Sequence, residues 1–290
     1  MPSDQHVLIR DRDSLLPSCY LTKNDLVTIY RRLQEKTQEA AELEVRDWVK
    51  PDDDSGQFDD TVNWVKGLFV VSVTIEGVNG EKYFGNDEAI FNSPNLPDRI
   101  ASVYFDTGSR HRGLNQNRNP LNWASVLLDF TKPPRFDLNN PVSSPTPNNS
   151  NIHVHGNDHS WVNTVFQTVM DLIEERRNDP IRGWIHNSHV YDILLWLVAM
   201  PLTFAVLNRA SGNVEALGLP TIFSAAIYIY LFVVFTNLFR FFFSYTKWVW
   251  PKVQLEHPRD HSSAHRFWWA GVSASLIASL IYGVFLSGSG

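Results

Sequence analysis

Three long apolar segments in the last hundred residues constrain this 290-residue chain more than any other feature. The segments 190–207, 219–239 and 267–286 contain a single charged side chain, that of Asp192. About twenty helical residues, at about 1.5 Å each, cross a hydrocarbon layer of roughly 30 Å. Surface helices of a soluble protein keep a polar stripe, which these segments lack. We therefore predict an all-α membrane domain of three transmembrane helices over residues 179–290, and a buried bundle in a soluble enzyme is the alternative.

The basic residues near these segments predict their direction. Eight Lys and Arg side chains precede the first segment or separate the second from the third, and one lies on the other side. Because cytoplasmic loops are enriched in Lys and Arg, we expect the amino terminus in the cytoplasm and the carboxyl terminus outside. Tryptophans, which prefer the membrane interface, fall at the same boundary. The expected interface anchors are Trp184, Trp248, Trp250, Trp268, Trp269, Arg240 and Lys247.

The rest of the chain is polar and acidic. Residues 1–189 hold 27 of the 31 acidic and 19 of the 25 basic side chains, and the net charge of −6 excludes a generally basic nucleic-acid binder. The single cysteine, Cys19, excludes an internal disulfide framework. Residues 1–16 contain no apolar run, so we expect no secretory signal peptide. Together with a domain on the cytoplasmic side, this composition suits a bacterial inner membrane.

Residues 23–178 predict a cytoplasmic α+β domain. Thr22, with Asp25 three residues later, is typical of a capping box that begins a helix. Four segments rich in apolar residues predict strands, and an apolar stripe after Asp158 predicts a second helix. The strands are expected at 68–76, 100–105, 125–130 and 152–155. We expect an antiparallel sheet of about four strands with two covering helices, preceded by a polar tail over residues 1–22.

The dipeptide Asn79-Gly80 follows the first predicted strand. Both residue types tolerate a positive φ, which a type I′ turn requires at its two central positions. A β-hairpin with this turn is therefore expected.

Histidines supply the candidate metal sites. His153 and His155 alternate on the fourth predicted strand, so their side chains share one face of the sheet. Completed by His159 or Asp158, they form a donor set suited to a metal such as zinc. In the simpler interpretation the histidines face water and Asp158 caps the next helix. A second set at a spacing of four lies between the last two membrane segments and comprises His257, His261 and His265. On a helix these imidazoles would align for a metal or for pH sensing, whereas Pro258 favours an irregular polar loop.

Small residues form a stripe along the third membrane segment. They recur every four positions, at Gly271, Ser275, Ser279 and Gly283. Such a small-xxx-small pattern lets the backbones of two helices approach closely. The partner helix belongs either to the same chain or to another subunit, and the pattern leaves both alternatives open.

Function is constrained mainly by absent motifs. The chain has no common nucleotide-binding or hydrolase motif, and its membrane segments are almost free of charge. We therefore expect a non-enzymatic membrane protein without a cofactor. Its cytoplasmic domain is expected to bind a protein or small-molecule ligand, and its helices to oligomerise in the bilayer, in one form as a membrane-permeabilising effector. The alternatives are a passive anchor or assembly subunit, and a membrane-anchored enzyme with a metal at the three histidines.

Overall fold

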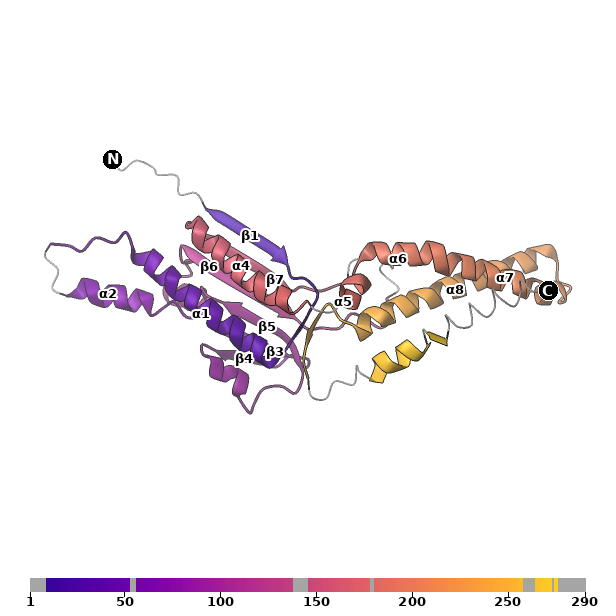
Figure 1. Cartoon of the computed structure of the whole chain (residues 1–290), viewed down its shortest axis with the longest axis horizontal. Helices are drawn as coiled ribbons and strands as arrows, with labels where there is room; N and C mark the ends of the chain where they lie inside the picture. Colours follow the sequence, from indigo (N-terminus) through magenta and orange to yellow (C-terminus); the bar gives the residue numbers. More distant parts are fainter. Residues whose placement is uncertain are drawn as a thin grey trace.

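The computed structural model describes residues 9–52, 56–137, 146–177, 180–257, 264–272 and 274–275. An α+β part and a long helical hairpin are joined end to end (Figure 1). The α+β part comprises β1 (Arg10–Leu15), β2 (Cys19–Leu21), α1 (Lys23–Val45), α2 (Gln57–Lys66), β3 (Ser72–Gly77), β4 (Lys82–Gly85), the 3₁₀ helix η1 (Glu88–Asn92), β5 (Ile100–Asp106), α3 (Ser109–Leu114), β6 (Asn122–Asp129), β7 (Asn151–Gly156) and α4 (His159–Glu175). The helical part comprises α5 (Pro180–Ile185), α6 (Ser188–Leu194), the π-helical turn η2 (Leu195–Ala199), α7 (Met200–Glu215) and α8 (Thr221–Val249), and β8 (Val253–Leu255) follows it.

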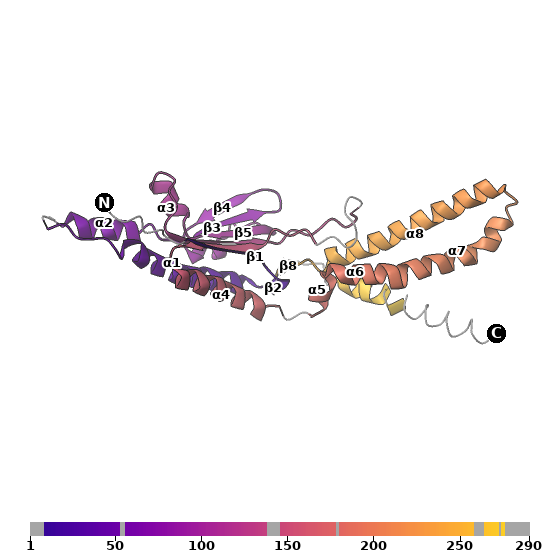
Figure 2. The same ribbon diagram turned by 90° about the horizontal axis from the view of Figure 1, so that it is seen from above.

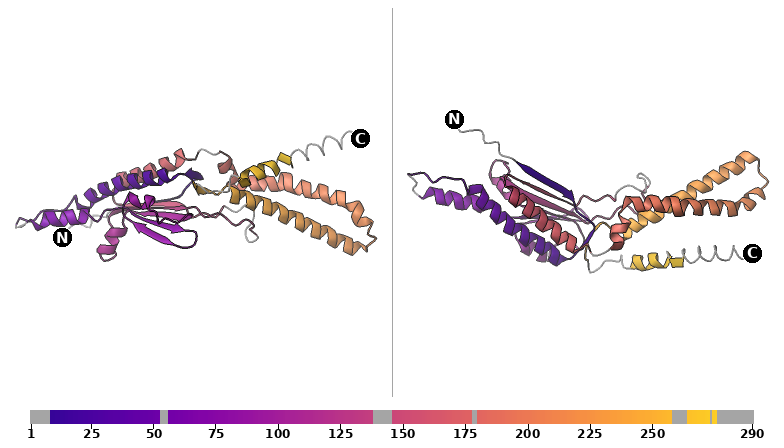
Figure 3. Two further views of the ribbon diagram at one scale, coloured as in Figure 1. Left: turned by 90° about the horizontal axis from the view of Figure 1, so that it is seen from below. Right: turned by 45° about the horizontal axis from the view of Figure 1, so that its top comes forward.

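The main sheet has six strands in the order β1-β7-β6-β5-β3-β4, and every neighbouring pair is antiparallel. Helices α1 and α4 cover one of its faces, whereas the short α3 projects from the other face (Figure 2). Two further views show the same arrangement (Figure 3). The predicted α+β class is confirmed, with α1 and α4 as the two covering helices. The predicted number of about four strands is too low, because β1 and β4 extend the sheet at its edges.

The edge strand β1 lies in the segment that sequence analysis assigned to a polar tail, and that assignment is wrong here. β1 pairs only with β7, and alternating charged residues suit a strand with one free edge. One of its arginines packs back onto the domain, because the guanidinium of Arg12 lies 3.8 Å from the ring centroid of Phe166 and donates to Asn163 Oδ1 at 3.2 Å. These tertiary contacts order a segment that has little apolar surface of its own.

The capping box at the start of α1 is confirmed. The backbone N–H of Asp25 donates to Thr22 Oγ1 at 3.2 Å, and the backbone N–H of Thr22 donates to Asp25 Oδ2 at 2.7 Å. Arg176, just after α4, donates to the other carboxylate oxygen of Asp25 at 2.7 Å. Although burial raises the pKa of Asp25, these hydrogen bonds outweigh burial and hold that pKa below its usual value. The carboxylate thus caps α1 and fixes the end of α4 beside it.

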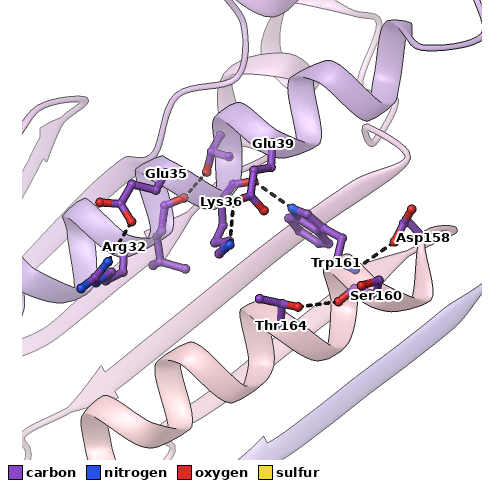
Figure 4. Close-up of polar contacts among 10 residues, drawn as sticks. Arg32, Glu35, Lys36, Glu39, Asp158, Ser160, Trp161 and Thr164 are labelled. Carbon is purple, nitrogen blue, oxygen red and sulfur yellow. Dashed lines mark hydrogen bonds and ion pairs between the residues drawn. The ribbon is translucent and has the colours of Figure 1, made fainter.

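A buried tryptophan joins the two covering helices (Figure 4). Trp161 of α4 is 4% exposed, and its indole Nε1–H donates to the backbone carbonyl of Lys36 in α1 at 2.8 Å. The backbone N–H of Trp161 donates to Asp158 Oδ1 at 2.9 Å, so the predicted cap of this helix is confirmed. The remaining inward side chains of α4 pack on the sheet at helical spacing; they are Val162, Val165, Phe166, Val169 and Ile173.

The hairpin after β3 forms as predicted, but its turn is not type I′. Gly80 has a φ of 89°, whereas Asn79 is not among the positive-φ residues of the described chain. The backbone N–H of Gly80 donates to the carbonyl of Gly77 at 3.0 Å, and that of Gly77 donates to the carbonyl of Glu81 at 2.8 Å. The loop between Gly77 and Glu81 has three residues, whereas a type I′ hairpin loop has two. A positive φ is therefore found at one position only, and Gly80 occupies it.

Among the residues that the structure describes, two helices are long and apolar enough to cross a membrane. They cover His189–Glu215, which includes α6, η2 and α7, and Thr221–Val249, which is α8. At about 1.5 Å per residue they are about 40 and 44 Å long, so both run past the predicted spans 190–207 and 219–239. Large apolar side chains on both helices are exposed, among them Trp196, Leu197, Phe204, Ile222, Ile229 and Val233.

Pro201 interrupts the first of these helices without ending it. A proline has no N–H for the carbonyl four residues earlier, and its ring crowds that carbonyl. Here the turn before it widens into the π-helical segment η2, and the backbone N–H of Met200 bonds to the carbonyl of Leu195. This local widening lets the helix continue through the proline.

The third predicted span, 267–286, lies mostly outside the described residues. Its first part is helical over residues 264–272. The described structure therefore does not test the predicted count of three membrane helices.

Candidate functional site

The open face of the sheet carries the two predicted histidines. Ile152 and Val154 are fully buried against the helices, so His153 and His155 face the other side, as their alternation predicts. Both imidazoles pack on the indole of Trp123 in β6, at centroid distances of 5.0 and 5.7 Å.

A carboxylate from the edge strand lies beside these histidines. Asp11 Oδ1 lies 2.6 Å from His155 Nδ1 and 4.0 Å from His153 Nε2. Sequence analysis missed Asp11 because it belongs to β1, the strand that was assigned to the tail.

His159 does not join this pair. It is the first residue of α4, which covers the opposite face of the sheet. Within the described ranges, no three or more His, Cys, Asp or Glu side chains are placed to hold a metal ion. The structure therefore brings His153 and His155 together and leaves the proposed third ligand elsewhere.

The second histidine set is also divided. His257 Nε2 contacts the backbone carbonyl of Asp98 in the α+β part, whereas His265 Nδ1 lies 2.8 Å from the hydroxyl of Tyr245 in α8. His261 lies outside the described residues. The chain at His257 is not helical, so the helical alignment of the set is not formed there.

A shallow groove of about 620 Å³ lies beside α3 on the open face. Its walls come from β3, from β4 and from α3, with Phe84 and Leu114 as exposed apolar side chains, 74% and 58% exposed. Ser72, Thr74 and Ser109 contribute hydroxyl groups. Apolar and hydroxyl groups of this kind suit a small ligand or a peptide side chain, and sequence analysis did not identify this groove.

The predicted interface anchors gather at the domain end of the hairpin. Tyr245 of α8 forms ring contacts with Trp248, Trp268 and Trp269 at centroid distances of 5.7, 6.2 and 5.7 Å. Lys247 Nζ lies 4.6 Å from the ring centroid of Tyr191, and Arg240 donates to the carbonyl of Asp137 at 3.4 Å. The other two anchors are Trp184 in α5, which is 55% exposed, and Trp250 directly after α8.

Half of the small-residue stripe is described. Gly271 and Ser275 are exposed on the helix that is described from residue 264, whereas Ser279 and Gly283 lie outside the described residues. Among the described residues, no atom lies within 4 Å of the position that a Cβ would take at Gly271. The visible part of the stripe is thus not covered by the described part of its own chain.

Two three-residue strands tie the helical hairpin back to the α+β part. β2 and β8 pair in parallel, with Cys19 opposite Val253 and Leu21 opposite Leu255. β2 leads directly into α1, and β8 begins four residues after the end of α8. The start of a covering helix and the exit of a membrane-length helix therefore share one small sheet, which we call the clasp.

Arg182 of α5 is buried beside the clasp and donates hydrogen bonds to both of its strands. It is 3% exposed, and it donates to the carbonyl of Cys19 in β2 and to Gln254 Oε1 in β8, both at 3.0 Å. Arg266, on the helix that follows, donates to the same Gln254 oxygen at 2.7 Å. The chain before the first membrane-length helix, the chain after the second, and the next helix thus meet at one amide group.

The thiol of Cys19 in the clasp is buried. Burial raises its pKa to about 12, so this thiol is neutral at physiological pH.

The clasp was not predicted from the sequence. Strands of three residues give no periodic pattern. The sequence analysis used Arg182 only as one of the basic residues that predict the direction of the membrane segments. The buried position of an arginine before an apolar segment has no sequence signature by itself.

Comparison of the chain with protein-family models, with curated proteins and with solved structures gave no match.

A partly buried histidine next to the clasp makes stability depend on pH. His186 Nδ1 lies 2.8 Å from Thr146 Oγ1. Burial, with the nearby charges of Arg182, Lys247 and Lys252, lowers the pKa of His186 from 6.5 to about 4. Between pH 6.5 and about 4 the unfolded chain binds this proton and the folded chain does not, so stability falls as pH falls through that window.

We expect acidification from pH 7 to 4.5 to remove up to about 3 kcal/mol of stability through His186. The variant His186→Gln should flatten this part of the profile, as measured by the unfolding midpoint in detergent micelles. His189→Gln, at an exposed position three residues later, is the matched control and should keep the wild-type profile. An identical pH profile for wild type and His186→Gln would contradict the assignment.

Proposed function

We propose that this chain is an integral membrane protein that couples a ligand-binding cytoplasmic domain to helices that assemble in the bilayer. In its active form it acts as a membrane-permeabilising effector, when binding of a cytoplasmic protein or small molecule to the domain rearranges the helices. The observation that carries this proposal is the clasp, because a change in the domain at β2 or α1 acts directly on the exit of α8. The lipid bilayer and further copies of the chain are its partners.

The exposed apolar surface of the hairpin supports insertion into a membrane. Such surface in water is unfavourable by about 25 cal/mol per Å², whereas lipid removes that cost. The excess of Lys and Arg at the domain end of the hairpin supports a cytoplasmic amino terminus. With residues 267–286 as a third span, the carboxyl terminus lies outside, and a bacterial inner membrane fits this arrangement.

The uncovered part of the stripe supports assembly. Gly271 and Ser275 present a flat helix surface, on which a second helix backbone packs closely. Side chains without charge dominate α8, so a pore formed by several copies fits better than a transport pathway within one copy.

The second candidate function is a passive anchor or assembly subunit. It shares the membrane insertion and lacks the coupling between ligand and helices. The groove beside α3 favours the coupled version, because it offers the α+β part a place to bind a small ligand or peptide. A membrane-anchored metal enzyme is the least supported alternative, since His159 lies apart from His153 and His155.

Membrane insertion and direction are tested first. Carbonate extraction should leave the full chain in the membrane fraction, and reporters fused to the two ends should give signals from opposite sides. Release of the intact chain by carbonate, or two signals from one side, would remove the proposal.

Assembly is tested with Gly271→Ile. We expect wild type to form oligomers in nanodiscs or detergent, measured by mass photometry, and Gly271→Ile to shift the population at least tenfold toward monomer, because the added side chain keeps helix backbones apart. Gly212→Ile is the control, since a Cβ at this α7 position also meets no described atom within 4 Å. A monomeric wild type, or equal loss in both variants, contradicts assembly through the stripe. Depolarisation of cells that express the chain separates the effector from the passive anchor.

A further inference from the structure

The chain after β6 leaves the sheet and, over residues 131–137, lies along the domain end of α8 (Figure 2). We call residues 131–137 the arm. Phe136 contacts Phe241 at a centroid distance of 5.9 Å. About two helical turns further along α8, Arg135 Cζ and Lys132 Nζ lie 4.4 and 4.9 Å from the ring centroid of Trp248. The arm therefore follows α8 over about two helical turns, from Phe241 to Trp248.

The length of α8 places this contact at a defined depth if the helix crosses a membrane, as the proposed function holds. The helix is about 44 Å long and the hydrocarbon layer about 30 Å thick, so about nine of its 29 residues extend beyond the hydrocarbon. Counted from Thr221, the hydrocarbon ends near Arg240, the first charged residue of α8. The arm thus lies beside the part of α8 that passes through the lipid headgroups.

Lys132 and Arg135 are the outward cations of this region. Both are exposed, and they lie against one indole ring. Asp137, the last described residue of the arm, also faces α8, because its carbonyl accepts from Arg240 and its carboxylate acts electrostatically on Lys247. An anionic group that approaches this exposed pair is attracted by both cations.

We propose that Lys132, Arg135 and Trp248 bind the headgroup of an anionic phospholipid of the cytoplasmic leaflet. Lysine and arginine form charge-assisted hydrogen bonds with a phosphodiester, and tryptophan prefers this depth of a bilayer. The partner is a lipid with a net negative headgroup, such as phosphatidylglycerol, rather than zwitterionic phosphatidylcholine. The arm directly follows β6 and is not part of the membrane helices. A lipid bound to the arm therefore holds the α+β part against the membrane surface.

The test measures lipid binding to the full chain purified in detergent, by native mass spectrometry with phosphatidylglycerol or phosphatidylcholine. We expect wild type to bind phosphatidylglycerol at least tenfold more tightly. The variant Lys132→Ala/Arg135→Ala should weaken that binding about 30-fold, at about 5-fold for each cation near an anionic surface. The charge-preserving variant Lys132→Arg/Arg135→Lys should bind within about 3-fold of wild type. Lys82→Ala/Arg118→Ala, which removes two exposed cations of the α+β part outside the groove beside α3, is the matched control and should bind as wild type does.

Salt and free phosphate complete the test. Binding of phosphatidylglycerol to wild type should weaken as ionic strength rises, because screening acts on exposed charges. This measurement does not depend on the folding of any variant. Inorganic phosphate at the same concentration should not compete, since it lacks the acyl chains that hold the headgroup at this depth.

The outcomes separate the two proposals. Equal affinity for both lipids, salt-independent binding, competition by phosphate, or an unchanged preference in the alanine variant each overturns the lipid site. A chain that carbonate extracts overturns the proposed function instead. A chain that stays in the membrane and shows no lipid preference leaves the proposed function in place and rejects only this site.

Discussion

Replacing Arg182 by methionine should open the clasp. Methionine keeps much of the apolar volume and removes two hydrogen bonds from a charged group, so the carbonyl of Cys19 loses this buried donor while Gln254 Oε1 keeps only Arg266. A buried acceptor that loses its donor costs about 1–3 kcal/mol. We therefore expect the free energy of local opening of β2 and β8 to fall by about 3 kcal/mol, which raises the open population roughly a hundredfold.

Amide hydrogen exchange measures this opening directly. The amides of β2 and β8 should exchange about a hundredfold faster in Arg182→Met, while those of β3, β5 and β6 stay protected. Arg12→Met is the matched control, because Arg12 also combines a hydrogen bond with packing, but at β1. It should speed exchange in β1 and leave the clasp unchanged. Unchanged protection of β2 and β8 in Arg182→Met would mean that the strand pairing alone holds the clasp.

The clasp variant also separates anchoring from coupling. Arg182→Met should remain in the membrane fraction, because the apolar surface of the hairpin is unchanged. Loss of ligand-dependent depolarisation with retained insertion is the result expected of a protein that transmits a change through β2 and β8. A passive anchor has no such response to lose.

Local patterns were sufficient for the inner part of the fold. The capping box of Thr22 and Asp25, the cap at Asp158 and the apolar stripe of α4 are confirmed because each depends on residues within a few positions of one another. The inner strands β3, β5, β6 and β7 are buried on the helix-covered face, so their apolar residues mark them.

Long-range contacts decided what the sequence did not predict. β1 is polar, and it becomes a strand only because β7 offers it an edge and Phe166 accepts the guanidinium of Arg12. The clasp joins Cys19 to Val253, which lie more than two hundred residues apart in the sequence. The alternation of His153 and His155 predicted their common face, but Asp11 and Trp123 reach them from other strands.

The end of α8 is a further feature that tertiary contacts decide. Hydropathy gives the part of α8 that suits hydrocarbon, and the predicted span 219–239 ends where Arg240 begins the charged part. The helix continues to Val249 because the aromatic residues after Arg240 pack on the arm and on the following helix. Tertiary packing, rather than apolar character, sets this end.

Trp161→Ala should cause the largest loss of stability in the α+β part. Trp161 fills the seam between α1 and α4, and truncation of a buried tryptophan costs about 3–5 kcal/mol through lost burial and the cavity that remains. The variant Trp161→Phe keeps most of the packing and loses the hydrogen bond to the carbonyl of Lys36, so it should cost about 1–2 kcal/mol.

Trp64→Ala is the matched control, because Trp64 also lies on a helix but is 55% exposed. It should change stability by less than about 0.5–1 kcal/mol. Urea unfolding followed by circular dichroism, in the detergent used for purification, compares the three variants. Equal losses in Trp161→Ala and Trp64→Ala would mean that α1 and α4 do not depend on the seam. A loss confined to Trp161→Ala would show that the two covering helices form one layer. Since α1 directly follows β2, the clasp is continuous in sequence with that layer.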